Sequence, residues 1–292
     1  MRMDENDENA APSGGYAAVN LLVENNESDA EDYGSIIDAF NQDRKSIDRH
    51  VTQEAHEIIE SDPELKNRKS TVIYNPRWMK GIVGIVASRL IETYFRPTVV
   101  LTQSNGFATG SARSVPGFDL YQAVESCADL LENFGGHMYA AGLTMRPENV
   151  GEFTRRFNAY VEENIDPQML VPQVDVDAEL LFSEITPAFR RELKRFEPFG
   201  PGNAAPIFAT RSVSNRGDAK LVGAECEHLR MDLTQRQKPN TTLQCIAFQQ
   251  PEHFEWIRSG RPVDVCYQIV ENHYRGTVST QLRIKDIKRV EK

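Results

Sequence analysis

Apolar side chains between residues 29 and 60 recur three, four and seven positions apart, with charged residues between them. They are Tyr33, Ile36, Ile37, Phe40, Ile47, Val51, Ala55 and Ile58. This period predicts one helix from about Asp29 to Glu60, roughly 48 Å long at about 1.5 Å per residue. Asp62-Pro63 is expected to end it. A helix of this length either bridges two bodies or forms a helical hairpin packed on the next domain, and the pattern allows both.

Residues 70–166 alternate between strand-like and helix-like runs. The predicted strands are Ser70–Tyr74, Thr98–Thr102 and Phe107–Ser114, and the predicted helices are Gly81–Phe95, Leu120–Phe134 and Pro147–Asn164. Asp119 is placed to cap the second of these helices. Strand–helix–strand spacing indicates parallel pairing in a small sheet covered by helices, which is an α/β unit.

The pattern changes after a proline-containing segment, Asp166–Val174, that is typical of a linker. Thr186-Pro187 predicts the start of a short helix. Strand-like runs follow at Ile207–Ser214, Leu229–Thr234, Thr242–Phe248, Val263–Val270 and Val278–Ile287. Glu271–Gly276, between the last two runs, carries a hairpin signal. Five short strands in residues 170–292 favour a small closed barrel of the OB-fold type.

The net charge of −10 by itself argues against a nucleic-acid partner. The distribution of the charged residues along the chain changes this interpretation. Residues 1–70 hold 17 acidic and 7 basic side chains, whereas residues 71–292 hold 26 of each. The excess therefore belongs to an acidic start, with residues 1–16 expected to be disordered, and to connector helices at residues 17–69. The two domains predicted after them, at residues 70–166 and 170–292, are electrically balanced.

The four cysteines lie far apart and form no CxxC pair, so we expect reduced thiols rather than a zinc site or disulfides. The acidic start is unlike a secretory signal. The apolar run near Ile82–Ala87 is much shorter than the ~18 residues that a membrane span needs. These features favour a cytoplasmic protein without a membrane partner.

Two segments are unusually rich in glycine and other small residues: Gly110–Ser114 (GSARS) and Phe134–Gly142 (FGGHMYAAG). Both are expected beside strand ends, where open sheets bind ligands. Glycine lets backbone N–H groups approach a phosphate, while serine hydroxyls and an arginine fork add directed donors. His137 could reach the same ligand. Alternatively, the glycines mark a tight turn and Arg113 pairs with a surface acid.

Several motifs taken together resemble the C-terminal part of the RecJ family. These are Trp78–Leu90 (WMKGIVGIVASRL), Arg96-Pro97, GSARS, Gly135–Gly142 (GGHMYAAG) and Pro198–Asn203 (PFGPGN). RecJ proteins are single-stranded-DNA-specific 5′→3′ exonucleases of the DHH phosphoesterase superfamily. The resemblance extends over roughly residues 17–292. It implies an α/β DHH-associated domain followed by an all-β OB-fold barrel, preceded by a long connector helix.

The resemblance also implies roles for particular residues. Ser111 and Arg113, with Gly110 and Ser114 beside them, would hold a phosphate at the 5′ end of single-stranded DNA. Gly135, Gly136 and His137 would line the cleft that faces the metal site, with His137 assisting catalysis. On the barrel, the track for the strand would use Arg211, Arg216, Lys220, Arg230 and Tyr274. An ordinary solvated strand face is the alternative for each barrel residue. Met79 stands where the family usually has histidine, which leaves that position without the polar contact.

The family's catalysis depends on a cluster of Asp and His residues that binds two divalent ions, Mn²⁺ or Mg²⁺. The chain has no Asp-His-His motif, and Asp175-Val-Asp177 is expected to be a solvent-facing edge. We therefore expect no metal site in this chain alone and no nuclease activity without a missing or separate DHH domain. The alternative function is a non-catalytic module that binds single-stranded nucleic acid or assembles with a protein.

Overall fold

The computed structural model describes residues 14–217, 219–235, 238–274 and 276–290. The chain divides into two compact units, residues 1–172 and 173–292. Most of the acidic end predicted to be disordered lies outside the described residues, but residues 14–16 already belong to a helix. Within the described ranges, no helix combines the length and the apolar character needed to cross a membrane.

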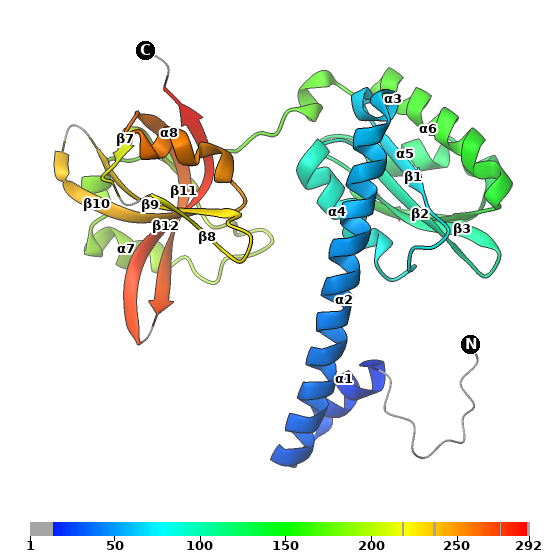
Figure 1. Ribbon diagram of the computed structural model, residues 1–292, viewed down its shortest axis with the longest axis horizontal. Helices are drawn as coiled ribbons and strands as arrows, with labels where there is room; N and C mark the ends of the chain where they lie inside the picture. Colours follow the sequence, from blue (N-terminus) through cyan, green and yellow to red (C-terminus); the bar gives the residue numbers. More distant parts are fainter. Residues whose placement is uncertain (1–13, 218, 236–237, 275, 291–292) are drawn as a thin grey trace. The chain divides into compact units, whose positions relative to one another are not determined.

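The first unit contains a helical arm and a five-stranded sheet (Figure 1). Its helices are α1 (Gly14–Val23), α2 (Glu27–Ser61), α3 (Pro63–Asn67), α4 (Val83–Tyr94), α5 (Leu120–Glu125) and α6 (Val150–Asn164), with 3₁₀ turns at Ala128–Leu130, Pro147–Asn149 and Pro167–Leu170. Its strands are β1 (Thr71–Tyr74), β2 (Thr98–Ser104), β3 (Phe107–Arg113), β4 (Leu131–His137) and β5 (Ala140–Met145).

The sheet order is β1-β2-β3-β5-β4. β1 and β2 are parallel, as the strand–helix–strand spacing predicts, and the remaining pairs are antiparallel. The predicted helix Leu120–Phe134 is wrong in its second half, because α5 ends at Glu125 and residues 131–137 form β4. Gly135 and Gly136 disfavour a helix, and pairing with β5 satisfies the backbone instead. Asp119 does cap α5, accepting from the Gln122 N–H at 3.2 Å.

The two faces of this sheet are covered differently. One face packs on α5 and α6 through an apolar cluster that includes Ala112, Leu143, Phe153 and Phe157. On the other face, α4 contacts β2 and β3 and belongs, with the second half of α2, to a separate cluster around Val100. The β4–β5 part of this second face is exposed at Gly135, His137 and Gly142.

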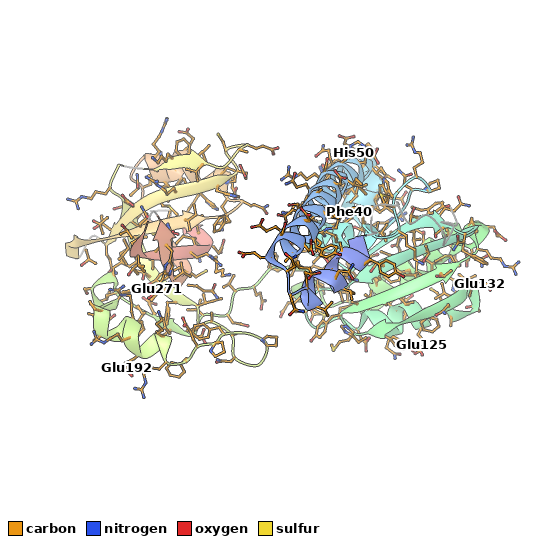
Figure 2. The ribbon with its side chains drawn as sticks, turned by 90° about the horizontal axis from the view of Figure 1, so that it is seen from below. Phe40, His50, Glu125, Glu132, Glu192 and Glu271 are labelled. Carbon is orange, nitrogen blue, oxygen red and sulfur yellow. The ribbon has the colours of Figure 1, made fainter. Side chains whose placement is uncertain are left out.

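Helix α2 is buried along its second half, at Asp48, Val51, Ala55 and Ile59. Val51, Ala55 and Ile59 pack on the α/β unit, and α1 lies beside the N-terminal end of α2 (Figure 1). Asp62 ends α2 and caps α3, as expected before Pro63. Phe40, on the first half of α2, is 50% exposed (Figure 2).

The second unit is a β-barrel with short helices. Its strands are β6 (Ala178–Glu179), β7 (Phe208–Asn215), β8 (Lys220–Val222), β9 (His228–Gln235), β10 (Lys238–Ala247), β11 (Val263–Tyr274) and β12 (Thr277–Arg289). Its helices are α7 (Pro187–Lys194) and α8 (Phe254–Arg258), with 3₁₀ turns at Phe182–Glu184 and Pro251–His253. The sequence predicts the five long strands and α7, whereas β6, β8 and α8 are too short to show a period.

Five of these strands close on themselves in the order β7-β11-β12-β10-β9, with β9 pairing back to β7. β10 and β12 are parallel, and the other neighbours are antiparallel. Leu229, Met231 and Leu233 alternate inward along β9 and join the barrel core. Closure removes the exposed strand edges of an open sheet, and it confirms the predicted barrel.

A buried hydroxyl pair in this core gives a stability prediction. The Thr210 hydroxyl donates to the Leu180 carbonyl at 2.7 Å and accepts from the Tyr267 hydroxyl at 2.7 Å. Burial raises the pKa of Tyr267 to about 12. Thr210→Val strands a buried donor and a buried acceptor, so it should destabilise the barrel by about 1–3 kcal/mol, more than Tyr267→Phe at about 0.5–1.5 kcal/mol.

Urea unfolding followed by Trp256 fluorescence, in a Trp78→Phe background, measures both variants, since Trp256 lies in the barrel unit. Tyr267→Phe leaves Thr210 bonded to Leu180, so the double variant should cost less than the sum of the two single variants. A larger loss for Tyr267→Phe than for Thr210→Val would contradict this account.

Candidate nucleic-acid interface

Strand β3 and the first turn of α4 form a polar corner, the arginine corner, made of Gly84, Ser111 and Arg113. Arg113 Nη1 donates to Ser111 Oγ at 2.7 Å and to the Ala112 carbonyl at 2.9 Å. A Cβ on Gly84 would lie 3.2 Å from Arg113 Nη2 and 3.4 Å from Ser111 Oγ, so the first turn of α4 lies directly over both. Within the described residues, Arg113 forms no ion pair with a carboxylate, which leaves its charge available to an anion.

The N-terminus of α4 adds to the positive character of this corner. Its N-cap residue, Ile82, makes no side-chain capping bond. The first N–H groups of a helix carry partial positive charge and bind anions when no side chain caps them. A guanidinium, a hydroxyl and a helix N-terminus therefore meet in one place, and phosphate suits all three.

Strand register joins this corner to the second glycine-rich segment. Arg113, Ala140 and His137 form one row across β3, β5 and β4. The next row contains Ser111, Gly142 and Gly135, on the same face of the sheet. Both segments lie on neighbouring antiparallel strands and include strand ends, as expected, because β3 ends at Arg113 and β4 ends at His137.

The glycines here serve two different purposes. A Cβ on Gly110 would lie 2.1 Å from the Val100 carbonyl oxygen, and one on Gly136 (φ +152°) would lie 2.2 Å from the Ala140 carbonyl oxygen. The backbone itself excludes side chains at these two positions. At Gly135 no atom lies within 4 Å of an added Cβ, and at Gly142 the nearest is 4.0 Å away. These two glycines are not required by packing, and they leave a flat floor between Ser111 and His137.

His137 and Ser114 differ in their freedom to contact a ligand. His137 is exposed, and its Nδ1 accepts from the Tyr139 N–H at 3.2 Å, which leaves Nε2 directed elsewhere. The Ser114 hydroxyl donates to the Phe118 carbonyl at 2.8 Å and is half-buried. Ser114 thus has an internal role in the turn after β3, whereas His137 lies on the same face of the sheet as the open floor and is exposed there.

On the barrel, a second set of side chains forms the basic–aromatic face, made of Lys220, His228, Arg230, Ile246, Phe248 and Arg283. Register places Lys220 beside Arg230, Arg230 beside Ile246, and Ile246 beside Arg283. The face therefore runs across β8, β9, β10 and β12. Ile246 is 8% exposed although it lies outside the barrel core, so the flanking side chains cover it.

Phe248 is the exposed aromatic of this face, at 46% exposure. The Arg283 guanidinium lies 5.8 Å from its ring centroid, and the His228 ring meets it edge-on at 4.9 Å. An exposed ring held by a cation and a second ring is a stacking platform for a base. Phe248, His228 and Arg283 could not be predicted as site residues from the sequence, because barrel closure and strand register bring them to Arg230.

The other barrel residues predicted to bind the strand have different surroundings. Arg211 is ion-paired with Glu179 at 2.8 Å and with Asp264 at 3.5 Å, and the Glu179 bond raises its pKa. It thus matches the alternative of a solvated strand face. Arg216 donates to Thr242 Oγ1 at 3.1 Å and is exposed beside β10. Tyr274 ends β11, and its side chain lies outside the described part of the structure.

In the described ranges, no group of three or more His, Cys, Asp or Glu side chains is placed to hold a metal ion. Asp175 and Asp177 are exposed, and Asp177 accepts from the Ile207 N–H at 2.8 Å. The residues of both candidate surfaces are donors and rings rather than carboxylates. They fit phosphate and bases, and they do not fit a divalent cation.

Comparison with known proteins agrees with this division into two domains. The DHHA1 domain family matches residues 67–163, and the RecJ OB domain family matches residues 176–286. The RecJ of Thermus thermophilus, solved in complex with Mn²⁺, superimposes with a TM-score of 0.74 at 26% identity over 95% of this chain. The chain belongs to the RecJ family.

Its relatives are longer proteins. The single-stranded-DNA-specific exonuclease RecJ of Bacillus subtilis is 31% identical over 92% of this chain and 34% of its own length. The Escherichia coli RecJ is 31% identical over 92% of this chain and 47% of its own length. The Thermus thermophilus structure is covered over 39% of its length. The chain thus spans less than half the length of these relatives.

The glycine geometry yields a stability prediction for this RecJ chain. Gly142→Ala and Gly135→Ala should leave stability unchanged or raise it by about 0.5–1 kcal/mol, because glycine in a strand costs backbone entropy. Gly110→Ala and Gly136→Ala should lower stability by about 1–3 kcal/mol, since their Cβ atoms meet backbone. Thermal unfolding of the four variants tests this, and equal losses at all four positions would refute the distinction.

Proposed function

We propose that this chain is the substrate-binding part of a RecJ-like exonuclease that degrades single-stranded DNA from its 5′ end, in the cytoplasm, during DNA repair and recombination. The observation that supports it most is the arginine corner beside an open glycine floor. A terminal phosphate fits the corner, and the attached nucleotide fits a floor without side chains. The proposal is further supported by the relatives from Bacillus subtilis and Escherichia coli, which are single-stranded-DNA-specific exonucleases.

In this proposal, Arg113 and Ser111 bind the 5′ phosphate through charge-assisted hydrogen bonds. Gly135 and Gly142 allow the sugar or base to approach the sheet closely, and His137 contacts the same nucleotide from the far side of the floor. Every group involved is a donor or a flat surface, so the unit holds and orients the substrate. A duplex end would bring a second strand to the floor formed by Gly135 and Gly142. A single-stranded end brings only one strand there.

The barrel binds the strand itself through the basic–aromatic face. Phe248 stacks a base, while Arg230, Arg283 and Lys220 follow the phosphates. Together these contacts depend little on sequence, because each base has a flat face and each linkage has a charge. Arg216 extends the same track from the segment after β7.

Hydrolysis belongs to the whole enzyme in this proposal, with two divalent ions, Mn²⁺ or Mg²⁺, held by a DHH domain. Solved structures of Thermus thermophilus RecJ contain Mg²⁺ in one case and Mn²⁺ in another. Those ions activate water and neutralise the phosphate. In this proposal the described residues bind the substrate, and His137 contacts the reacting nucleotide.

The phosphate role of Arg113 predicts a preference for one kind of DNA end. A 5′-phosphorylated oligonucleotide should bind about tenfold or more tightly than its 5′-hydroxyl counterpart, because hydrogen bonds to a charged group contribute about 1.5–3 kcal/mol. Arg113→Ala should abolish the difference in fluorescence anisotropy titrations. Arg155→Ala, an exposed arginine paired with Glu152, is the matched control. Equal affinity of the wild type for both ends would remove Arg113 from this role.

The proposed role of the basic–aromatic face predicts separate effects on the affinity for single-stranded DNA and on the salt dependence of that affinity. Phe248→Ala should weaken binding of an oligothymidylate by about 1–3 kcal/mol, the contribution of one stacked base. Arg283→Ala and Arg230→Ala should each reduce the slope of log affinity against log salt by about 0.7. Arg211→Ala, which removes an arginine already paired with two acids, should change neither. A wild-type affinity independent of salt would favour the protein-assembly alternative.

A further inference from the structure

The loop between β1 and α4, residues 75–82, is tied to α2 through a single buried indole. Trp78 is 5% exposed and belongs to the apolar cluster formed by α2 and α4. Its Nε1 donates to Glu54 Oε2 of α2 at 2.7 Å. Its carbonyl accepts from Thr102 Oγ1 of β2 at 2.5 Å. The loop is therefore held by α2 on one side and by the sheet on the other.

This loop leads directly into the turn that lies over the arginine corner. The Ile82 N–H donates to the Met79 carbonyl at 3.0 Å, which joins the loop to the start of α4. Two residues later, Gly84 has so little space that an added Cβ would come within 3.2 Å of Arg113 and 3.4 Å of Ser111. A shift of a few tenths of an ångström in this turn therefore changes the space available to Arg113.

Helix α4 is bonded to α2 at two further points. Arg89 donates to both carboxylate oxygens of Asp48, at 2.7–3.1 Å, and the Asp48 side chain is 4% exposed. The Tyr94 hydroxyl donates to Glu60 at 3.0 Å and lies 3.1 Å from His56 Nδ1. The contacts of Arg89 and Tyr94 hold the body and the end of α4. The Glu54–Trp78 bond is different because it acts at the start of α4, next to the corner.

We infer that Glu54 and Trp78 are positioning residues for the phosphate site. The carboxylate of Glu54 fixes the indole, the indole fixes the loop, and the loop sets the height of the first turn of α4 above Arg113 and Ser111. Helix α2 is thereby coupled mechanically to phosphate binding. The inference rests on the proposed phosphate role of Arg113, and its test separates the two.

The test compares the affinity of the full chain for 5′-phosphorylated and 5′-hydroxyl oligonucleotides of one sequence. Glu54→Ala should reduce the wild-type preference of about tenfold to about twofold or less. Glu54→Gln keeps an amide oxygen of the same reach and should restore most of it. Glu57→Ala is the matched control on the same helix, since Glu57 is bonded to Gln53 of α2 rather than to the loop. A loss confined to Glu54→Ala would support a positioning role.

Fluorescence reports the indole itself. In a Trp256→Phe background Trp78 is the single tryptophan of the chain. Its emission should shift to longer wavelength in Glu54→Ala, return toward wild type in Glu54→Gln, and change on addition of the 5′-phosphorylated oligonucleotide. If Glu54→Ala does not fold, Trp78→Phe replaces it in the binding assay, because phenylalanine keeps a ring in the cluster but cannot donate to Glu54.

The outcomes are distinguishable. A wild type that binds both ends equally overturns the proposed phosphate role and this inference with it. A wild type with the preference, together with a folded Glu54→Ala or Trp78→Phe variant that retains it in full, overturns the inference alone. Equal losses in Glu54→Ala, Glu54→Gln and Glu57→Ala would assign the effect to α2 in general and overturn the specific role of the Glu54–Trp78 bond.

Discussion

The candidate site depends on unequal covering of one sheet face. Helix α4 packs over β2 and β3, which buries Val100 and fixes the first turn of the helix above Ser111 and Arg113. The same face is exposed over β4 and β5, at His137 and Gly142. A fully covered face would have no room for a ligand, and an uncovered one would leave Arg113 without a fixed direction. Arg113 lies at the border between the covered and the exposed regions. Its guanidinium is therefore held by neighbouring groups and is still accessible to a ligand.

Local patterns predicted much of this arrangement, and long-range pairing decided the rest. β1, α4, β2 and β3 follow each other with clear periods and strong boundaries, so their prediction is confirmed. The run from Leu131 to Phe134 fits a helical period equally well, and only pairing with β5 makes it a strand. The chemistry of GSARS and GGH could be foreseen from residue type. Their meeting in adjacent rows could not, because it requires the order β3-β5-β4.

The barrel face shows the same limit. Arg230 and Lys220 stand out in the sequence as basic residues, yet so does Arg211, which is paired with Glu179 and Asp264. Phe248 follows the last residue of β10, and nothing in its neighbourhood along the chain marks it. Its importance comes from Arg283 and His228, which reach it from two other strands. A closed barrel brings distant residues together, so a contact between them leaves no local signal.

The net charge of −10 takes on another meaning once the acids of α2 are located. Asp48, Glu54 and Glu60 each accept hydrogen bonds from α4 or the loop before it, so part of the acidic excess holds the connector helix to the α/β unit. Among the residues that the structure describes, Arg113 of the arginine corner and Lys220, Arg230 and Arg283 of the barrel face form no ion pair with a carboxylate. If both surfaces bind the same strand, as proposed, their covalent connection would raise the effective concentration of that strand at the second surface once the first has bound it. Neither surface would then need high affinity or bulk positive charge of its own.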